Sequence, residues 1–447
     1  MQKNEDITLK ITDITSEGNG VGRHEGMAVF VPGTAVGDTA LVKIVKLQKS
    51  YAYGKLLKLI SPSDTRCDAD CDSFPLCGGC VFRHIKYSEE KRIKTEIVKN
   101  ALSRIGGLDI PVLPIMAGKD EGYRNKAQYP INGEGRVGFF APRSHRIIPI
   151  NNCRLQPPIF SEIARVFELW IKQYKVSIYN EQTGKGLVRH LYLRSSAKSE
   201  VLVTVVINGE NLPHFEPLIE ILRSMLGDKL CGFCININRK QTNVILGDVC
   251  KTLYGEGYLI DEICGVRLRV SPLSFAQVNH DMAEQLYTAA ADAAAPEGKT
   301  VIDLYCGTGA IGLIMASRAK SVIGVEIVPQ AVLDARFNAE HNGIKNARFI
   351  CDDAAGAAAK LRDEGIKADV VVVDPPRKGC DAELLSIIAE SFCPERIVYV
   401  SCDPATLARD LKILSGLGYR TLSATPADLF PRTAHVETVA SLVREQA

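Results

Sequence analysis

The first sixty residues alternate short apolar runs with glycine-rich turns. Runs such as ITLKITDI, MAVFVPG, TALVKIVKL and YAYGKLLKLI are separated by turns such as GNGVGRHEG. Short runs rich in Val, Ile and Tyr and bounded by Gly or Pro are typical of β-strands. About five strands in so short a segment favour a small closed barrel. We therefore predict an OB-like β-barrel over residues 1–60.

The pattern from residue 61 to about 270 mixes helical and strand signals. SPSD at 61–64 is typical of a linker, and residues 88–106 place Ile93, Ile97, Ala101 and Ile105 on one helical face. HLYLRSS, VLVTVVIN and NVILGDV have strand character, and a second helix is expected near 213–226. This pattern predicts a mixed α/β domain over residues 61–270.

Strands and helices alternate regularly from residue 271 to residue 447. The expected strands are TVIDLYCG, SVIGVEI, ARFICDD, ADVVVVDPP and RIVYVSC. Helices are expected near 310–318, 329–341, 354–363, 381–391 and 405–414. Apolar strands that alternate with helices predict a mostly parallel, doubly wound α/β sheet, so residues 271–447 form the third domain.

Composition favours a cytoplasmic protein with a large apolar core. The chain has 447 residues, of which 46% are hydrophobic. No apolar run reaches the roughly 20 residues of a membrane span, and MQKNEDITLKI lacks the apolar core of a signal peptide. Fourteen cysteines in a reducing compartment are expected to be thiols or metal ligands rather than disulfides.

Charge is distributed unevenly although the net charge is only +2. Residues 81–154 carry 14 Lys and Arg against 7 Asp and Glu, whereas residues 271–447 carry 17 against 23. This asymmetry favours a polyanion that docks on the middle of the chain, against the alternative of a solvated basic face. Candidate phosphate contacts are Arg124, Lys126, Arg136 and Arg143. Candidates to stack on a nucleic-acid base, which are equally suited to the core, are Phe139, Phe140 and Phe275.

A glycine-rich turn follows the first strand of the third domain. Residues 307–312 of TVIDLYCGTGAIGL have the G-x-G-x-x-G spacing, and Glu326 ends the next strand, where a carboxylate can accept ribose hydroxyls. Both features are shared with dinucleotide sites. Further polar side chains end or follow strands: Asp303, Glu326, Asp353, Asp374 and Cys402. An acidic rim suits the cationic S-adenosylmethionine, whereas a pyrophosphate prefers positive groups.

Cys402 lies between a strand and the next helix, in RIVYVSCDPATLARDL. Asp403 is a good N-cap and Pro404 suits the first helical turn. A helix N-terminus lowers the pKa of a thiol, so we expect a reactive thiolate. The alternative is a small buried apolar residue, which is the fate expected for Cys306, Cys351 and Cys380.

A thiolate at such a site suits methylation of uracil at carbon 5. That carbon becomes nucleophilic when a thiolate adds to carbon 6, and a base must then remove the proton from carbon 5. The segment FPRTAHVETVASL offers His435 and Glu437 as the base.

Four cysteines cluster in CDADCDSFPLCGGC: Cys67, Cys71, Cys77 and Cys80. A local group of four thiols that ends in Cys-x2-Cys favours zinc by its spacing alone, with an iron–sulfur cluster as the alternative.

Several motifs together resemble the RNA 5-methyluridine methyltransferases, and specifically their 23S ribosomal RNA branch that carries an iron–sulfur cluster. These motifs are SCDP, DPPRKG, DLFPRTAHVE, LYCGTG and SPLSFAQVN. GNGVGR and VFVPGTAVGD resemble the TRAM domain of that family, an OB-like RNA-binding barrel, and CGGCVFRHIKY resembles its cluster segment.

The resemblance implies a role for each matching residue. Cys402 would be the nucleophile and Glu437 the base. Four residues would surround S-adenosylmethionine: Gln277, Tyr305, Glu326 and Asp374. Asp353 is a weaker candidate for contact with the adenine. A [4Fe-4S] cluster would bind four cysteines, with Cys67 left out: Cys71, Cys77, Cys80 and Cys153.

The implied function is S-adenosylmethionine-dependent methylation of carbon 5 of a uridine in 23S ribosomal RNA, by a monomer. The alternatives are uridine methylation of another RNA such as tRNA, or a non-catalytic iron–sulfur protein that binds RNA. A radical methylthiotransferase needs Cys-x3-Cys-x2-Cys, which is missing. An RNA cytosine-5 methyltransferase needs a Pro-Cys motif, which is also missing.

Overall fold

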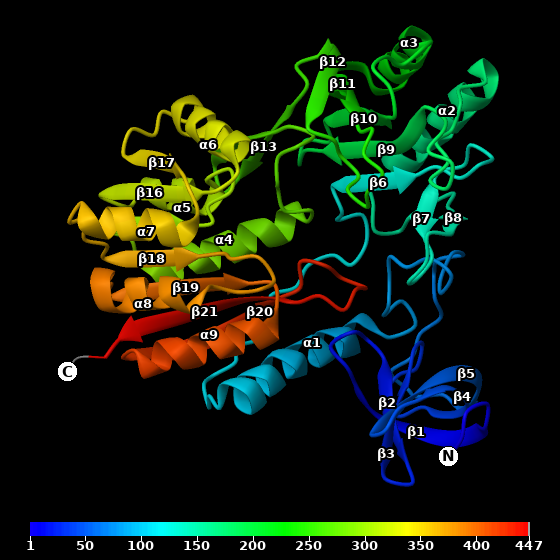
Figure 1. Ribbon diagram of the computed structural model, residues 1–447, viewed down its shortest axis with the longest axis horizontal. Helices are drawn as coiled ribbons and strands as arrows, with labels where there is room; N and C mark the ends of the chain where they lie inside the picture. The colour runs from blue at the N-terminus through cyan, green and yellow to red at the C-terminus, as the bar shows by residue number, and fades with distance from the viewer. Residues whose placement is uncertain (446–447) are drawn as a thin grey trace.

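The computed structural model describes residues 1–445, and its N-terminal segment is a closed β-barrel with strand order β1-β2-β3-β5-β4 (Figure 1). Alternate side chains of β1, among them Ile7, Leu9 and Ile11, point into the barrel core. The predicted barrel is therefore confirmed. Its strands are β1 (Asp6–Ile14), β2 (Gly20–His24), β3 (Met27–Val31), β4 (Thr39–Leu47) and β5 (Tyr51–Ser61).

A second sheet, with strand order β12-β11-β10-β9-β6, forms the middle of the molecule. Its strands are β6 (Lys126–Pro130), β9 (Val188–Ser195), β10 (Val201–Ile207), β11 (Leu230–Ile237) and β12 (Val249–Gly255). Helices α2 (Pro158–Tyr174) and α3 (Phe215–Leu226) pack their apolar sides into one core with this sheet. A short hairpin, β7 (Gly138–Phe140) and β8 (Ile147–Pro149), extends from it.

Two expectations for the middle of the chain are wrong: the strand over NVILGDV, and the place of Ile105 on the apolar face of the first helix. Residues 243–248 of NVILGDV form a loop, because Asn236 and Asn238 donate side-chain hydrogen bonds to its carbonyl groups and so replace a strand partner. The helix predicted over 88–106 is α1 (Tyr87–Ala101) followed by a π-helical turn at Leu102–Gly106. That change of pitch turns Ile105 out to solvent, where its side chain is 47% exposed.

The C-terminal sheet has strand order β17-β16-β15-β18-β19-β21-β20. Its strands are β15 (Thr300–Leu304), β16 (Ser321–Glu326), β17 (Ala347–Cys351), β18 (Val370–Val373), β19 (Arg396–Ser401), β20 (Tyr419–Ala427) and β21 (Glu437–Arg444). The first five of these strands are parallel, and β21 lies antiparallel between β19 and β20. The mostly parallel, doubly wound sheet is therefore as predicted.

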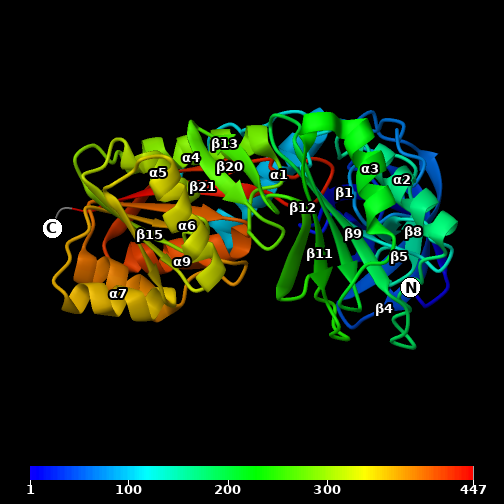
Figure 2. The same ribbon diagram turned by 90° about the horizontal axis from the view of Figure 1, so that it is seen from above.

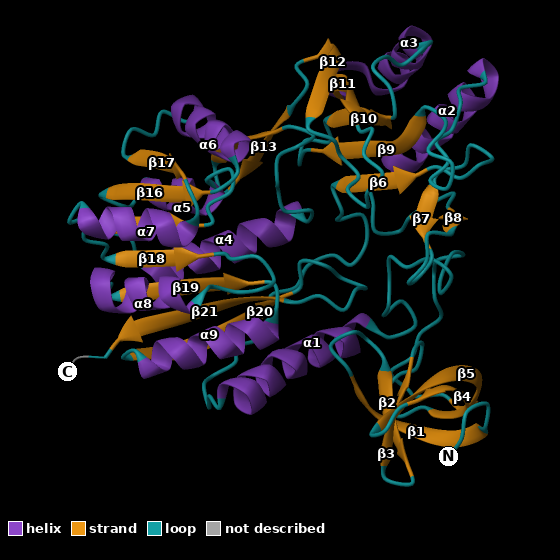
Figure 3. Cartoon of the chain, viewed as in Figure 1, coloured by secondary structure: helices purple, strands orange, loops and turns teal. Residues whose placement is uncertain are grey.

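Helices cover both faces of this sheet (Figure 3). One face packs against α4 (His280–Ala294), α5 (Ala310–Ala316) and α6 (Pro329–His341). The other packs against α7 (Ala354–Asp363), α8 (Ala382–Ser386) with a π-helical turn at Ile387–Phe392, and α9 (Pro404–Gly416). Because both faces are buried, the strands are almost entirely apolar.

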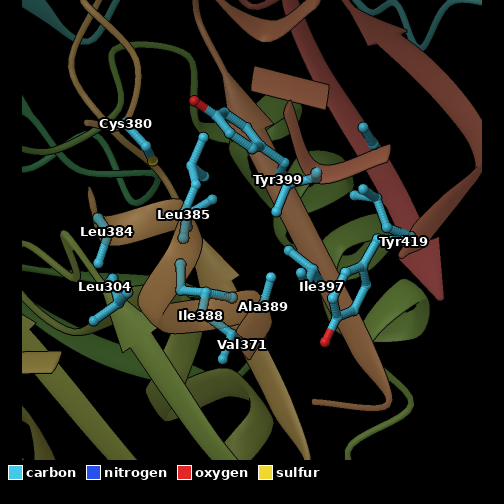
Figure 4. Packing of buried hydrophobic residues seen from close by; sticks show 14 of the residues in the cluster. Leu304, Val371, Cys380, Leu384, Leu385, Ile388, Ala389, Ile397, Tyr399 and Tyr419 are labelled. Atoms are coloured by element: carbon cyan, nitrogen blue, oxygen red, sulfur yellow. The ribbon is translucent and has the colours of Figure 1, made fainter. Parts of the chain in front are cut away.

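The core beneath α8 and α9 contains Cys380, which is buried as expected (Figure 4). Cys306 is partly buried, against the core on the other face of the sheet. Cys351 was expected to be buried as well, but its side chain is exposed. It is the last residue of β17, the outermost strand of the sheet, so no neighbouring strand covers it.

The C-terminal sheet lies on one side of the molecule, and the barrel and the middle sheet lie together on the opposite side (Figure 2). Helix α1 crosses from the barrel to the C-terminal sheet and packs along α9 (Figure 1). The hairpin of β13 (Leu259–Ile263) and β14 (Val266–Val270) leads from the middle sheet into α4. Within residues 1–445, no helix is long and apolar enough to cross a membrane.

Candidate functional site

One cavity of about 1380 Å³ opens at the carboxyl edge of the C-terminal sheet and extends to the middle sheet and the cysteine segment. Every residue to which the family resemblance assigned the role of nucleophile, base, cofactor contact or cluster ligand lines this cavity. These residues are Gln277, Tyr305, Glu326, Asp374, Cys402, Glu437, Cys71, Cys77, Cys80 and Cys153.

The glycine-rich turn after β15 holds Glu326 in place. Gly307 and Gly309 have φ values of 55° and 82°, a backbone conformation that favours glycine. The turn brings the Gly307 N–H to 3.0 Å from Glu326 Oε2, while Val328 donates its N–H to Oε1 at 2.8 Å. Each carboxylate oxygen keeps a free acceptor position, so Glu326 can still accept hydroxyl groups from a ligand in the cavity.

Other acidic residues at this edge have different roles. Asp303 is buried and its side chain accepts a hydrogen bond from the Gly312 N–H at 2.9 Å, which stabilises the glycine-rich turn. Burial raises the pKa of Asp303 to about 7. Asp353 lines the cavity but caps α7, where its side chain accepts the Gly356 N–H at 2.9 Å. Asp374 faces the cavity, and burial raises its pKa to about 7.

Cys402 lies between β19 and α9, as the sequence predicted. Asp403 caps α9 by accepting the N–H groups of Ala405 and Thr406. The expected fall in the pKa of Cys402 is wrong, however. Burial raises its pKa to about 11, and the nearby carboxylates of Glu437 and Asp374 add to that rise. Burial, with the negative charges added to it, therefore outweighs the effect of the helix N-terminus on the pKa of Cys402.

Glu437 is brought beside Cys402 by strand pairing. Strands β19 and β21 are antiparallel with Ser401 opposite Thr438, and one further step in this register places Cys402 opposite Glu437. Only 4% of Glu437 is exposed, and its pKa is raised to about 8 by burial and by Asp374. A thiol and a mainly protonated carboxyl group therefore face one cavity side by side.

Arg377 is a site residue that the sequence reasoning missed. It follows Asp374 by three residues in DPPRKG, which was the available signal, and it lines the cavity. Its positive charge lowers the pKa of both Cys402 and Glu437, against the stronger effect of burial. Arg377 also lies 3.4 Å from Nε2 of His435, the other candidate base. The sequence segment offered both His435 and Glu437, the family resemblance implied Glu437, and the strand register also favours Glu437.

The cysteine segment brings together four thiols that include Cys153. Burial raises the pKa of Cys80 to about 12 and that of Cys153 to about 11, and nearby cysteines add to both. The neighbours that raise the pKa of Cys153 are Cys77 and Cys71. Gly78 donates its N–H to the Phe140 carbonyl at 2.9 Å and so holds the loop against the β7–β8 hairpin.

Cys67 does not line the cavity with these thiols. Its Sγ donates to the Arg83 carbonyl at 3.6 Å. Across residues 1–445, no three His, Cys, Asp or Glu side chains are arranged to bind a single metal ion. The compact zinc site that spacing favoured is therefore not formed by Cys67 with its three neighbours in the described chain.

Two of the candidate phosphate contacts converge in the cavity and two do not. Arg124 and Lys126 line it, and Lys126 lies opposite Arg194 across β6 and β9. Two like charges in register weaken a strand pair, and Lys126 has no ion pair among the residues described. The others are paired with carboxylates: Arg136 with Glu168 at 2.9 Å and Arg143 with Glu17 at 3.5 Å.

The three aromatic candidates also line the cavity, in different settings. Phe139 packs on Tyr129 with ring centroids 5.2 Å apart, and Phe140 lies beside His145. Phe275 is 65% exposed and is free to contact a ligand.

Comparison with known proteins agrees with this architecture. A family model for tRNA (Uracil-5-)-methyltransferase matches residues 265–445, and a TRAM domain model matches residues 2–57. An uncharacterized RNA methyltransferase of Clostridium tetani is 42% identical over 98% of this chain and 96% of its own length. Another, from Caldanaerobacter subterraneus, is 42% identical over 98% of both chains.

A solved structure covers almost the whole chain. It is the tRNA (uracil-54, C5)-methyltransferase of Pyrococcus abyssi in complex with S-adenosyl-L-homocysteine, with a TM-score of 0.81 and 28% identity. The match covers 98% of this chain and 99% of that one.

The N-terminal barrel and the doubly wound sheet with its cavity define an RNA-modifying methyltransferase that carries a TRAM domain. The chain belongs to the RNA (uracil-5-)-methyltransferase family, whose members depend on S-adenosylmethionine.

Proposed function

We propose that this enzyme methylates carbon 5 of a uridine in 23S ribosomal RNA, with Cys402 as nucleophile and Glu437 as base. The observation that supports the proposal best is the pairing of β19 with β21, whose last pair, Ser401 and Thr438, directly adjoins these two residues at the wall of one cavity. That wall also carries the acidic edge expected to hold S-adenosylmethionine.

The reaction begins when the Cys402 thiolate forms a bond to carbon 6 of uracil. The electron pair of the carbon 5–carbon 6 double bond moves toward oxygen 4, which gives an enolate. Carbon 5 then attacks the methyl carbon of S-adenosylmethionine, and the electron pair of the broken carbon–sulfur bond stays on the departing sulfur. Glu437 takes the proton from carbon 5. The double bond re-forms, and the bond between carbon 6 and Cys402 breaks to return the thiolate.

The cofactor end of the cavity suits S-adenosylmethionine, which supplies an electrophilic methyl group on a sulfonium. Glu326 would accept the ribose hydroxyls, because both its oxygens keep an acceptor position. Gln277 and Tyr305 would line the bound molecule, and Asp374 would face its cationic part. That positive charge would also lower the raised pKa values of Glu437 and Cys402.

We expect turnover to increase with pH between about 6 and 9. Glu437 acts as a base only when it is ionised, and its pKa is raised to about 8. Cys402 must also ionise, and its pKa is raised to about 11. The ionisation of both groups therefore raises turnover as the pH rises. Multiple-turnover rates of release of methylated RNA across this range test the expectation, and a rate that is flat or falls with pH would contradict it.

The cysteine segment would hold a [4Fe-4S] cluster through Cys71, Cys77, Cys80 and Cys153. One supporting observation is that these four thiols line the same cavity. The other is that Cys153 and Cys77 raise the pKa of Cys80, while Cys77 and Cys71 raise that of Cys153. In a cubane cluster each thiolate binds a different iron atom, so the four sulfurs stand further apart than the ligands of one ion. The cluster would join the cysteine loop to the end of the basic segment.

Replacing Cys153 or Cys67 by serine should separate the two possible ligand sets. Cys153→Ser should lose most of the iron and sulfide, whereas Cys67→Ser should keep about four irons per chain. Metal analysis and the visible absorption of anaerobically purified protein give the result. A colourless wild-type protein with zinc that is lost in Cys67→Ser would overturn the assignment.

The RNA would pass over the cavity near Arg124 and Lys126. Within residues 1–445 neither side chain forms an ion pair with a carboxylate, so both are available to bind the phosphates of an RNA. The 23S target rests on the resemblance of the cysteine segment. A tRNA target is the second candidate, because the similar Pyrococcus abyssi protein is a tRNA methyltransferase.

Mass mapping of 5-methyluridine in ribosomal RNA and tRNA, from cells with and without the gene, decides between these targets. Loss of a methylated uridine in 23S RNA supports the proposal. Loss confined to tRNA supports the second candidate, and no loss in either RNA contradicts both.

A further inference from the structure

The segment 428–436 connects β20 to β21 and leads directly to Glu437. It has no helix or strand of its own, so its shape depends on contacts with other parts of the chain. Those contacts come largely from residues 81–123, which are more than 300 positions away in the sequence.

Arg432 is the centre of these contacts. Its carbonyl accepts the N–H groups of Val81 and Phe82 at 2.9 and 3.2 Å, directly after the last cysteine of the loop. Its own N–H donates to Glu90 Oε1 at 2.7 Å. Its guanidinium donates to the Ile85 carbonyl at 2.8 Å. The guanidinium also pairs with Asp120.

The backbone of Arg432 is strained, which shows that these contacts determine its conformation. Its φ is 70°, in the left-handed region that side chains other than glycine rarely adopt. Such a conformation persists only where the surroundings hold it in place.

Lys94 holds the same segment from helix α1. Its side chain is completely buried, and Nζ lies 2.8 Å from Glu90 and 2.7 Å from Asp428. Nζ also donates to the Phe430 carbonyl at 3.1 Å. One face of α1 therefore fixes both the start of the segment and, through Glu90, its centre at Arg432.

We propose that Arg432 and Lys94 are positioning residues, which hold Glu437 where it can take the proton from carbon 5. This inference rests on the proposed function. Cys402 lies between β19 and α9, and within residues 1–445 it makes no hydrogen bond to Arg432 or Lys94. Weakening these anchors should therefore leave thiol addition and methyl transfer largely intact. Only the last step, which needs Glu437, should slow down.

The test is Arg432→Ala in quenched single turnovers with uridine-containing ribosomal RNA and labelled S-adenosylmethionine. Arg348→Ala is the matched control, because Arg348 is exposed on β17 and is absent from the cavity. We expect methyl transfer within about twofold of wild type, but release of methylated RNA slowed about 10- to 100-fold, with a covalent protein–RNA complex that persists. The control should behave as wild type.

Release at the wild-type rate would overturn the proposal, and so would an equal loss of methyl transfer and release in a folded protein. If Arg432→Ala does not fold, Arg432→Lys keeps the charge but not the forked contacts and should show a smaller stall of the same kind. The reaction of wild type with RNA that carries 5-fluorouridine tests the proposed function separately from the positioning role. If wild type forms no adduct with it, the proposed function fails. If wild type forms the adduct and neither variant stalls, only the positioning role fails.

Discussion

Replacement of Cys402 by alanine is expected to lower turnover by at least about 10⁴-fold, which is the scale seen when a nucleophile is removed. The reason is that carbon 5 of uracil attacks a methyl group only after carbon 6 has accepted the thiolate. The rate of methyl transfer to substrate RNA measures the loss. Cys351→Ala is the matched control, because Cys351 is exposed and outside the cavity.

Measuring the affinity of the Cys402→Ala variant for its ligands distinguishes a loss of chemistry from misfolding. Cys402→Ala should bind S-adenosylmethionine and RNA with nearly unchanged affinity, because Cys402 caps no helix and its side chain makes no hydrogen bond to another residue within residues 1–445. If Cys402→Ala retains more than about a tenth of the wild-type rate, Cys402 is not the nucleophile.

Replacement of Glu437 by glutamine is expected to have the second largest effect. Turnover should fall about 10²- to 10⁴-fold, the usual contribution of a general base. Addition and methyl transfer do not need this base, so a methylated RNA should stay attached to Cys402. A denaturing gel with labelled methyl groups would show that complex, which should be absent from wild type after the reaction ends.

His435→Gln is the matched control for the base, because His435 lies nearby but is the less favoured candidate. It should release methylated RNA close to the wild-type rate. If the covalent complex accumulates in His435→Gln and not in Glu437→Gln, the two residues have exchanged roles and the assignment of the base is wrong.

The regular elements could be predicted from the sequence because their patterns are local. The alternation from residue 271 onward shows the five parallel strands and the helices α5 to α9, although α4 and β20 were not predicted. The alternating runs before residue 61 show the barrel. The strand predicted over NVILGDV is wrong because the side chains of Asn236 and Asn238 donate hydrogen bonds to the carbonyl groups of this segment. Such pairing by distant amides leaves no trace in local hydrophobicity.

The chemistry of the site was harder to predict than its residues. Motifs led to Cys402 and Glu437, but the pKa of Cys402 depends first on burial and then on how close the carboxylates of Glu437 and Asp374 lie. That proximity results from strand order, which the sequence does not show. Arg377, Arg432 and Lys94 were missed for the same reason, since their partners are set by the tertiary fold.

The most direct test of the central claim is the reaction of the enzyme with RNA that carries 5-fluorouridine at the target, in the presence of S-adenosylmethionine. Fluorine cannot leave as the proton does, so the reaction should stop at a stable covalent complex. Peptide mass mapping should place the methylated nucleotide on Cys402, and Cys402→Ala should give no complex. No adduct with wild type, or an undiminished one with Cys402→Ala, would contradict the account.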